Sequence, residues 1–91
     1  MKSILQDDDF CFVCGDPNTE THHVLFGSAN RKLSDQYGLT VCLCSQHHRG
    51  RDGVHFNRPF DITLKKYAQV RFKAVYGANT DFQRVFGRNY L

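Results

Sequence analysis

The chain has 91 residues, of which 41% are hydrophobic and 23% are charged, with a formal net charge of +3. These ordinary values exclude disordered, fibrous and multidomain proteins, so we expect one domain over residues 1–91. No stretch approaches the roughly 20 apolar residues of a membrane span, and residues 1–9 lack the apolar segment of a secretory signal. We therefore expect an intracellular protein with no membrane partner.

The charge is distributed unevenly along the chain. Residues 1–20 carry one Lys against four Asp and one Glu, a balance of −4, whereas residues 21–91 carry eleven Lys or Arg against four Asp, a balance of +7. A basic body favours a polyanionic partner, although it is also a common means of staying soluble.

The beginning of the chain predicts an acidic leader and then a tight turn. Residues 6–9 are expected to be solvated or loosely attached. Cys11-x-x-Cys14 is followed by glycine and by an Asp-Pro-Asn sequence at 16–18, and these residue types favour tight reversals. The Cys-x-x-Cys spacing alone is typical of both metal knuckles and thiol redox proteins, so both interpretations are open at this point.

The middle of the chain predicts two strands and a short helix. β-Branched and aromatic residues favour a strand over Thr21–Phe26, and the polar segment Ser28–Gly38 is expected to form a loop. A second strand is predicted over Leu39–Leu43. A short helix then begins at Ser45 and must end at one of the two glycines that follow, at position 50 or 53.

Residues 61–91 predict helices. One helix is expected to begin with Asp61 as its cap and to end at Gly77, with apolar residues at helical spacing facing the core. These residues are Leu64, Tyr67, Ala68, Phe72 and Val75. The opposite face is expected to be solvated, with a DNA-tracking surface as the alternative, and consists of Lys65, Lys66, Gln69 and Lys73.

A last short helix is predicted near the end of the chain. Thr80–Gln83 matches a capping box, and the helix is expected to run to Phe86 and to end at Gly87.

Cysteine and histidine account for nine residues of this short chain. Cys44-x-x-His47, at the junction of a strand and a helix, supplies a second pair of soft ligands. The sequence therefore predicts a structural zinc ion held by Cys11, Cys14, Cys44 and His47. Cys42 points to the same face of the strand as Cys44 and is an alternative ligand, but we favour Cys44 because it begins the Cys-x-x-His spacing. Cys42 is then expected to be a small core residue.

Four further histidines are not needed by a structural zinc. His22 and His23 are adjacent on a predicted strand, so their side chains are expected to point to opposite faces and to have different roles. We expect one of the pair to bind a catalytic ion and the other to act as a base. His48 and His55 are the natural partners for that ion.

The order of these motifs resembles that of the HNH endonucleases of the ββα-metal superfamily, and in particular a small phage-encoded group that includes recombination-enhancement nucleases. The motifs span residues 11–55 and are Cys11-x-x-Cys14, His22-His23, Cys44-x-x-His47-His48 and Gly53-Val54-His55. The resemblance implies an α+β fold, in which a zinc-braced ββα-metal hairpin and helix is covered by C-terminal helices over residues 61–91.

The resemblance also implies roles for the histidines. His22, His48 and His55 are expected to hold a catalytic divalent ion, Mg²⁺, Mn²⁺, Ni²⁺ or Zn²⁺, and His23 is expected to be the general base. The middle Asn of the HNH signature has no clear counterpart, and Asn30 is a candidate to replace it.

DNA is the substrate that the resemblance implies, with a phage or host recombination or packaging protein as a further partner and the oligomeric state open. Basic residues in the segments expected to rim the site are suited to phosphate contacts. These residues are Arg31, Lys32, Arg49, Arg51 and Arg58. The missing Asn leaves an alternative: a non-catalytic zinc-binding module that binds DNA or a protein on the same scaffold.

Overall fold

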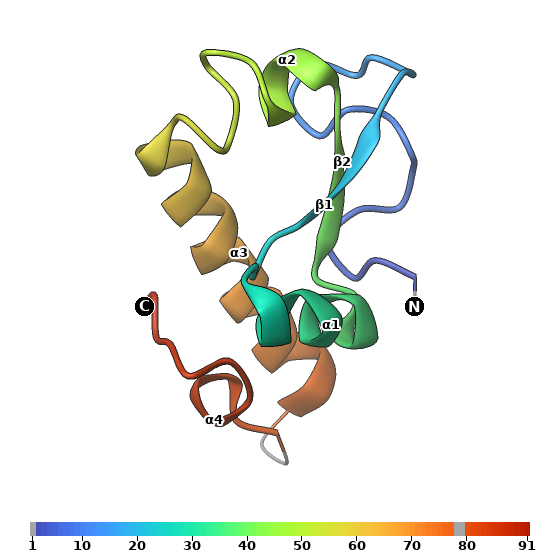
Figure 1. Ribbon diagram of the computed structural model, residues 1–91. Helices are drawn as coiled ribbons and strands as arrows, with labels where there is room; N and C mark the ends of the chain where they lie inside the picture. The colour runs from blue at the N-terminus through green and yellow to red at the C-terminus, as the bar shows by residue number, and fades with distance from the viewer. Residues whose placement is uncertain (1, 78–79) are drawn as a thin grey trace.

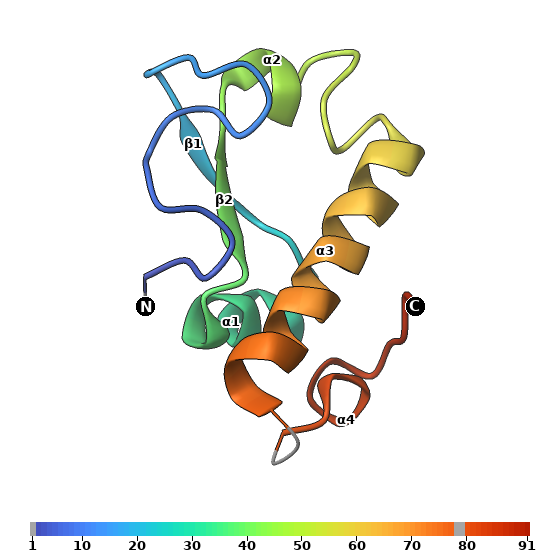
Figure 2. The same cartoon turned by 180° about the vertical axis from the view of Figure 1, so that it is seen from behind.

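A computed structural model describes residues 2–77 and 80–91 of the chain. Its elements are β1 (Glu20–His23), α1 (Ser28–Tyr37), β2 (Thr40–Leu43), α2 (Ser45–His48), α3 (Arg58–Tyr76) and α4 (Phe82–Phe86). These helices and strands confirm the predicted α+β class. Both views of the molecule show the hairpin of β1 and β2 between the N-terminal segment and the long helix α3, with α1 and α4 toward one end (Figures 1 and 2).

The two strands form an antiparallel sheet in which Glu20 pairs with Leu43 and His22 pairs with Val41. β1 is shorter than predicted, because it ends at His23 and not at Phe26. The Val24 amide still donates to the Leu39 carbonyl at 3.0 Å. The chain then leaves the sheet and turns at Gly27, whose φ of 101° is poorly accessible to other residues.

The predicted loop over residues 28–38 is wrong, because this segment forms α1. Few apolar residues mark the helix, but Leu33 and Tyr37 lie four positions apart and both pack against the core. Gly38 ends the helix in the left-handed conformation, with φ of 75°. Ser34 is fully buried, and its hydroxyl donates to the Leu25 carbonyl at 2.6 Å and accepts from the Leu25 amide at 3.1 Å.

The N-terminal leader was predicted to be solvated or loosely attached over residues 6–9, and for Gln6 this is corrected, because its side chain is bound to the sheet. The Gln6 side chain accepts a hydrogen bond from the Cys42 amide at 2.8 Å, and the Ile4 amide donates to the Gly38 carbonyl at 2.9 Å. The acidic residues that follow, at 7–9, are exposed. The leader therefore occupies backbone positions along β2 that otherwise face water.

Helix α3 begins earlier than predicted. Its cap is Asn57, whose side chain accepts a hydrogen bond from the Phe60 amide at 3.2 Å. Asp61 therefore does not cap the helix. It lies in the first turn and forms an ion pair with Lys65 at 2.7 Å.

The buried face of α3 consists of Leu64, Ala68 and Phe72, which are at most 2% exposed. Tyr67 and Val75, also predicted to face the core, are 37% and 45% exposed. The prediction that Lys65 lies on the solvated face of this helix is also wrong, because Lys65 is only 8% exposed. Its burial is compatible with its charge because Asp61 lies beside it.

Helix α4 completes an aromatic cluster around Phe72. The Phe72 ring lies 5.3 Å from that of Tyr37 and 5.5 Å from that of Phe82, measured between centroids. The cap of α4 is Asp81, whose carboxylate accepts from the Gln83 amide at 3.0 Å, and not Thr80 as the capping box suggests. Phe72 therefore joins α1, α3 and α4 in one core.

Within residues 2–77 and 80–91, no helix combines the length and the apolar character that crossing a membrane requires.

We expect Ser34→Ala to lower the free energy of unfolding by about 1–3 kcal/mol, because it leaves the buried Leu25 carbonyl and amide without their partner. Urea denaturation of the zinc-loaded protein measures the change. Ser28→Ala is the matched control, since Ser28 is exposed on the same helix. Equal stability of the two variants would contradict a structural role of the Ser34 hydroxyl.

Candidate functional site

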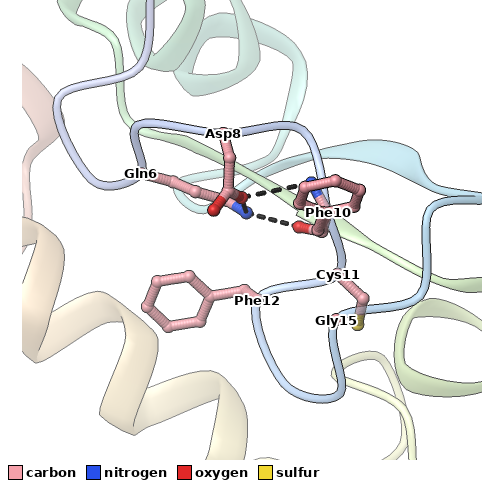
Figure 3. A pocket seen from close by; sticks show the side chains of 6 residues that line it. All are labelled: Gln6, Asp8, Phe10, Cys11, Phe12 and Gly15. Carbon is pink, nitrogen blue, oxygen red and sulfur yellow. Dashed lines mark hydrogen bonds between the residues drawn. The ribbon is translucent and has the colours of Figure 1, made fainter.

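The Cys-x-x-Cys turn folds over the junction between β2 and α2. The Cys11 amide donates to the Asp16 carbonyl at 2.8 Å, and the Gly15 amide donates to the Cys11 carbonyl at 2.9 Å, which closes the turn. The Phe12 amide donates to the Cys42 carbonyl at 2.8 Å and so ties the turn to β2. Figure 3 shows this turn, with the Phe12 ring extending toward α3; its centroid lies 5.9 Å from that of Tyr67.

Four potential ligands meet where this turn covers the start of α2. Cys11, Cys14, Cys44 and His47 each contribute one ligand atom, and these atoms lie within 4.8 Å of one another. The Cys14 and Cys44 sulfurs are 3.8 Å apart. Two sulfurs at a Zn–S distance of about 2.3 Å in a tetrahedron are separated by roughly 3.8 Å, so this spacing suits zinc.

The thiol of Cys11 ionises more readily than an ordinary cysteine thiol. Burial opposes its ionisation, but backbone amides, first that of Cys44, donate to the sulfur and lower its pKa from 9.0 to about 6. The pKa of Cys14 is raised: the Asp16 amide favours the thiolate, but desolvation and the neighbouring Cys11 and Cys44 sulfurs outweigh it. A cation among these sulfurs would offset that repulsion, because the thiolate is the form that ligates metal.

Cys42 lies outside the group of four. It pairs with Thr21 across the sheet and is half-buried, so it is not the fully buried core residue that was predicted. The preference for Cys44 over Cys42 as a ligand agrees with the cluster that the structure contains.

Three histidines form a second cluster. His22 of β1, His48 of α2 and His55 of the following loop each offer one ring nitrogen, and these nitrogens lie within 4.8 Å of one another. The Nε2 atoms of His48 and His55 are 3.1 Å apart. Two imidazole nitrogens on one tetrahedral ion are roughly 3.3 Å apart, so His48 and His55 have the spacing of two ligands of one ion, with a His22 nitrogen close by.

His22 is the most deeply buried member of this cluster, at 2% exposure. Desolvation, followed by the charges of His48 and His55, lowers its pKa from 6.5 to about 3, so the ring is neutral at pH 7. Its Nε2 atom is buried and has no hydrogen-bond partner within the described chain. A buried nitrogen without a partner is costly, and a metal ion is a partner that fits it.

His48 is oriented by a carboxylate. Its Nδ1 atom lies 2.7 Å from Oε1 of Glu20, so the proton belongs on Nδ1 and the Nε2 lone pair is free for an ion. Glu20 also accepts from the Arg49 guanidinium, with an Nε–Oε1 distance of 3.0 Å. Hydrogen bonds from His48 and then from Arg49 lower the pKa of Glu20, which keeps the carboxylate charged.

His55 reaches the cluster through a tight loop. The Val54 amide donates to the His47 carbonyl at 2.8 Å, and a Cβ at Gly53 would lie 2.8 Å from the carbonyl of His48. Only glycine permits this approach to the backbone of α2. Burial, followed by the charge of His48, lowers the pKa of His55, and so favours the neutral ligand form.

His23 lies beside the cluster but has a different partner. Its Nε2 atom is 3.5 Å from the Asp35 carboxylate of α1. The amide of Asn30, the candidate for the missing HNH asparagine, donates instead to the Phe86 carbonyl at 3.2 Å. Asp35 is therefore the side chain that α1 presents to His23, and it was not expected because this helix was not predicted.

One hollow of about 190 Å³ contains His23 and all three clustered histidines. Arg31 also lines it, unlike the other four basic residues predicted to rim the site. Arg49 is engaged with Glu20, and Arg58 lines a neighbouring hollow. Lys32 and Arg51 are exposed and line neither hollow.

The sequence interpretation missed two carboxylates, Glu20 and Asp35. Glu20 was recognisable, because residues two apart on a strand share a face and Glu20 precedes His22 by two positions. Asp35 was not, because its position depends on α1 packing against β1.

No protein-family model, curated protein or solved structure matches this chain. The chemistry of the site therefore has to be judged from its own residues. A group of three thiols and one imidazole is suited to holding a metal such as zinc, and the neighbouring imidazoles form a second potential ligand set that lines a hollow.

We expect Cys14→Ser to unfold the chain, as prolonged chelation also should, because a structural zinc contributes on the order of 10 kcal/mol to a small domain. Circular dichroism, with the metal content measured in parallel, checks this expectation. Cys42→Ser is the matched control and should retain both metal and fold. Native circular dichroism after complete zinc removal would contradict the assignment.

The low pKa of His22 predicts a pH dependence of stability. Below about pH 6.5 the unfolded chain takes up a proton on this ring, whereas the folded chain does so only near pH 3. The free energy of unfolding should therefore fall as the pH falls through this window. We expect it to fall by up to about 1.4 kcal/mol per pH unit more in the wild type than in His22→Gln between pH 6 and 5.

Urea denaturation at several pH values, in protein carrying one zinc ion per chain, measures this difference. Acid effects on the zinc cluster are common to both proteins and cancel in the comparison. Parallel pH profiles would show that His22 protonates as readily in the folded chain as in the unfolded one.

Proposed function

We propose that the protein is a metal-dependent DNA endonuclease of the HNH type, with a structural zinc at Cys11, Cys14, Cys44 and His47. The observation that carries this proposal is the convergence of His22, His48 and His55, with a buried His22 nitrogen that has no hydrogen-bond partner in residues 2–77 and 80–91. A simple zinc module has no need of this second group.

The arrangement of elements supports the proposal. An antiparallel hairpin is followed directly by a short helix, and each of β1, α2 and the loop after α2 supplies one histidine of the cluster. This is the order that the resemblance to ββα-metal nucleases implies. The zinc cluster would hold the hairpin and α2 together while the histidines bind the catalytic ion.

Phosphodiester hydrolysis requires a base for water and positive charge near the phosphate. A divalent ion held by His22, His48 and His55 would supply a Lewis acid for the phosphate and the leaving oxygen. His23 lines the same hollow and is the proposed base. Histidine is the side chain that most often transfers protons in enzymes that work near neutral pH.

Two side chains assist in this scheme. Asp35, 3.5 Å from the His23 ring, stabilises the imidazolium that forms when His23 takes a proton. Arg31 lines the hollow and supplies a guanidinium to a phosphate oxygen. Asp35 acts on the positive charge that forms on His23, and Arg31 acts on the negative charge of the phosphate. Both charges increase during the reaction.

We expect His23→Ala to lower the rate of DNA cleavage by about 10²–10⁴-fold, because it removes the proton acceptor. Nicking of supercoiled plasmid with Mg²⁺, Mn²⁺ or Ni²⁺ measures the rate. Gln36→Ala, an exposed change on α1, serves as the matched control and should cleave like the wild type.

Metal counting provides an independent arm of the same experiment. The proposal requires one tightly bound zinc and a second ion that is lost in His22→Ala while the fold is retained. Background nicking by wild type and His23→Ala alike, with a single metal per chain, would overturn the proposal and favour a non-catalytic zinc-binding module.

A further inference from the structure

A second hollow adjoins the histidine cluster and has a different lining. It measures about 300 Å³ and is lined by Phe26, Val54, His55, Phe56, Arg58 and Asp61. It shares Phe26 and His55 with the hollow that contains the other histidines. A ligand in the second hollow would therefore lie next to the proposed ion site.

Two phenylalanines in this lining are exposed to solvent. Phe26 is 45% exposed and Phe56 is 72% exposed. A single exposed aromatic residue is unremarkable, but two aromatic rings and a guanidinium in one hollow form a combination typical of sites that bind single-stranded nucleic acid. The proposed nuclease reaction does not use either ring.

One face of the Phe26 ring packs against the side chain of Lys65. The ammonium of Lys65 lies 4.1 Å from the ring centroid, and Lys65 is itself fixed by Asp61 at 2.7 Å. The ring centroid of His55 is 5.8 Å away. One face of the ring is therefore covered by a cation, and the ring offers its exposed part to a ligand with little loss of freedom.

The charge of the hollow suits a nucleotide. The carboxylate of Asp61 is neutralised by Lys65, so Arg58 contributes the unbalanced charge of the lining.

We infer that this hollow binds an unpaired nucleobase of a DNA strand, stacked against Phe26 and Phe56, with Arg58 on an adjoining phosphate. The inference rests on the proposed function and specifies its substrate as DNA with unpaired nucleotides beside the cleaved bond. Bases inside a duplex are already stacked, so only an unpaired base can offer its face to these rings.

Binding of labelled oligonucleotides tests this inference without cleavage. The zinc-loaded full chain, with no other metal added, is titrated against a single-stranded 12-residue thymidine oligonucleotide, the same backbone with abasic sites, and a blunt duplex. Fluorescence anisotropy reports the affinity. The variants are Phe56→Ala, Phe56→Tyr and the control Phe10→Ala, in which Phe10 is 51% exposed on the Cys-x-x-Cys turn.

We expect Phe56→Ala to weaken single-strand binding by about 5- to 150-fold, because it removes one stacking surface. Phe56→Tyr should retain the affinity, since a phenol ring stacks equally well, and Phe10→Ala should not change it. The abasic strand should bind more weakly and should not respond to Phe56→Ala.

Unchanged binding by Phe56→Ala, or equal affinity for the abasic strand, would overturn the inference and leave the two rings as a contact for a protein partner. The outcome is separable from that of the proposed function. Plasmid nicking that depends on His23 together with unchanged binding would reject only the nucleobase site, whereas Phe56-dependent binding without any cleavage would reject only the nuclease.

Discussion

The contact between the Cys-x-x-Cys turn and the start of α2 is the constraint on which the rest of the site depends. Cys44 and His47 belong to the junction of β2 and α2, so any ion that joins them to Cys11 and Cys14 fixes the first turn of that helix. His48 follows His47 directly, and the Val54 amide returns to the His47 carbonyl. An ion in the group of Cys11, Cys14, Cys44 and His47 would therefore determine where two of the three clustered histidines lie.

The second cluster is maintained by burial and by one carboxylate. Three imidazoles this close repel one another when protonated, and the buried position of His22 keeps its pKa low, at about 3. Glu20 fixes the proton of His48 on the nitrogen that faces away from the cluster. Neutral rings with converging lone pairs are the form that a metal ion requires.

The covering helix has a part in the site as well as in the core. Phe72 joins α1 and α4 to α3, whereas Lys65, about two turns from the start of the same helix, lies under Phe26 beside the histidines. Removing Asp61 alone would leave a buried ammonium without its partner, which is costly. This buried ion pair connects the helical half of the chain to the hollow that we assign to a nucleobase.

The sequence by itself determined the ligand spacing and the presence of two strands, because these depend on local geometry: a tight turn and a period of two. It did not reveal α1, whose weakly apolar sequence becomes helical when Ser34, Leu33 and Tyr37 pack against the core. Burial of Lys65 and the approach of Asp35 to His23 also needed the tertiary structure. Each depends on residues far apart in the chain, and only the packed helices bring them together.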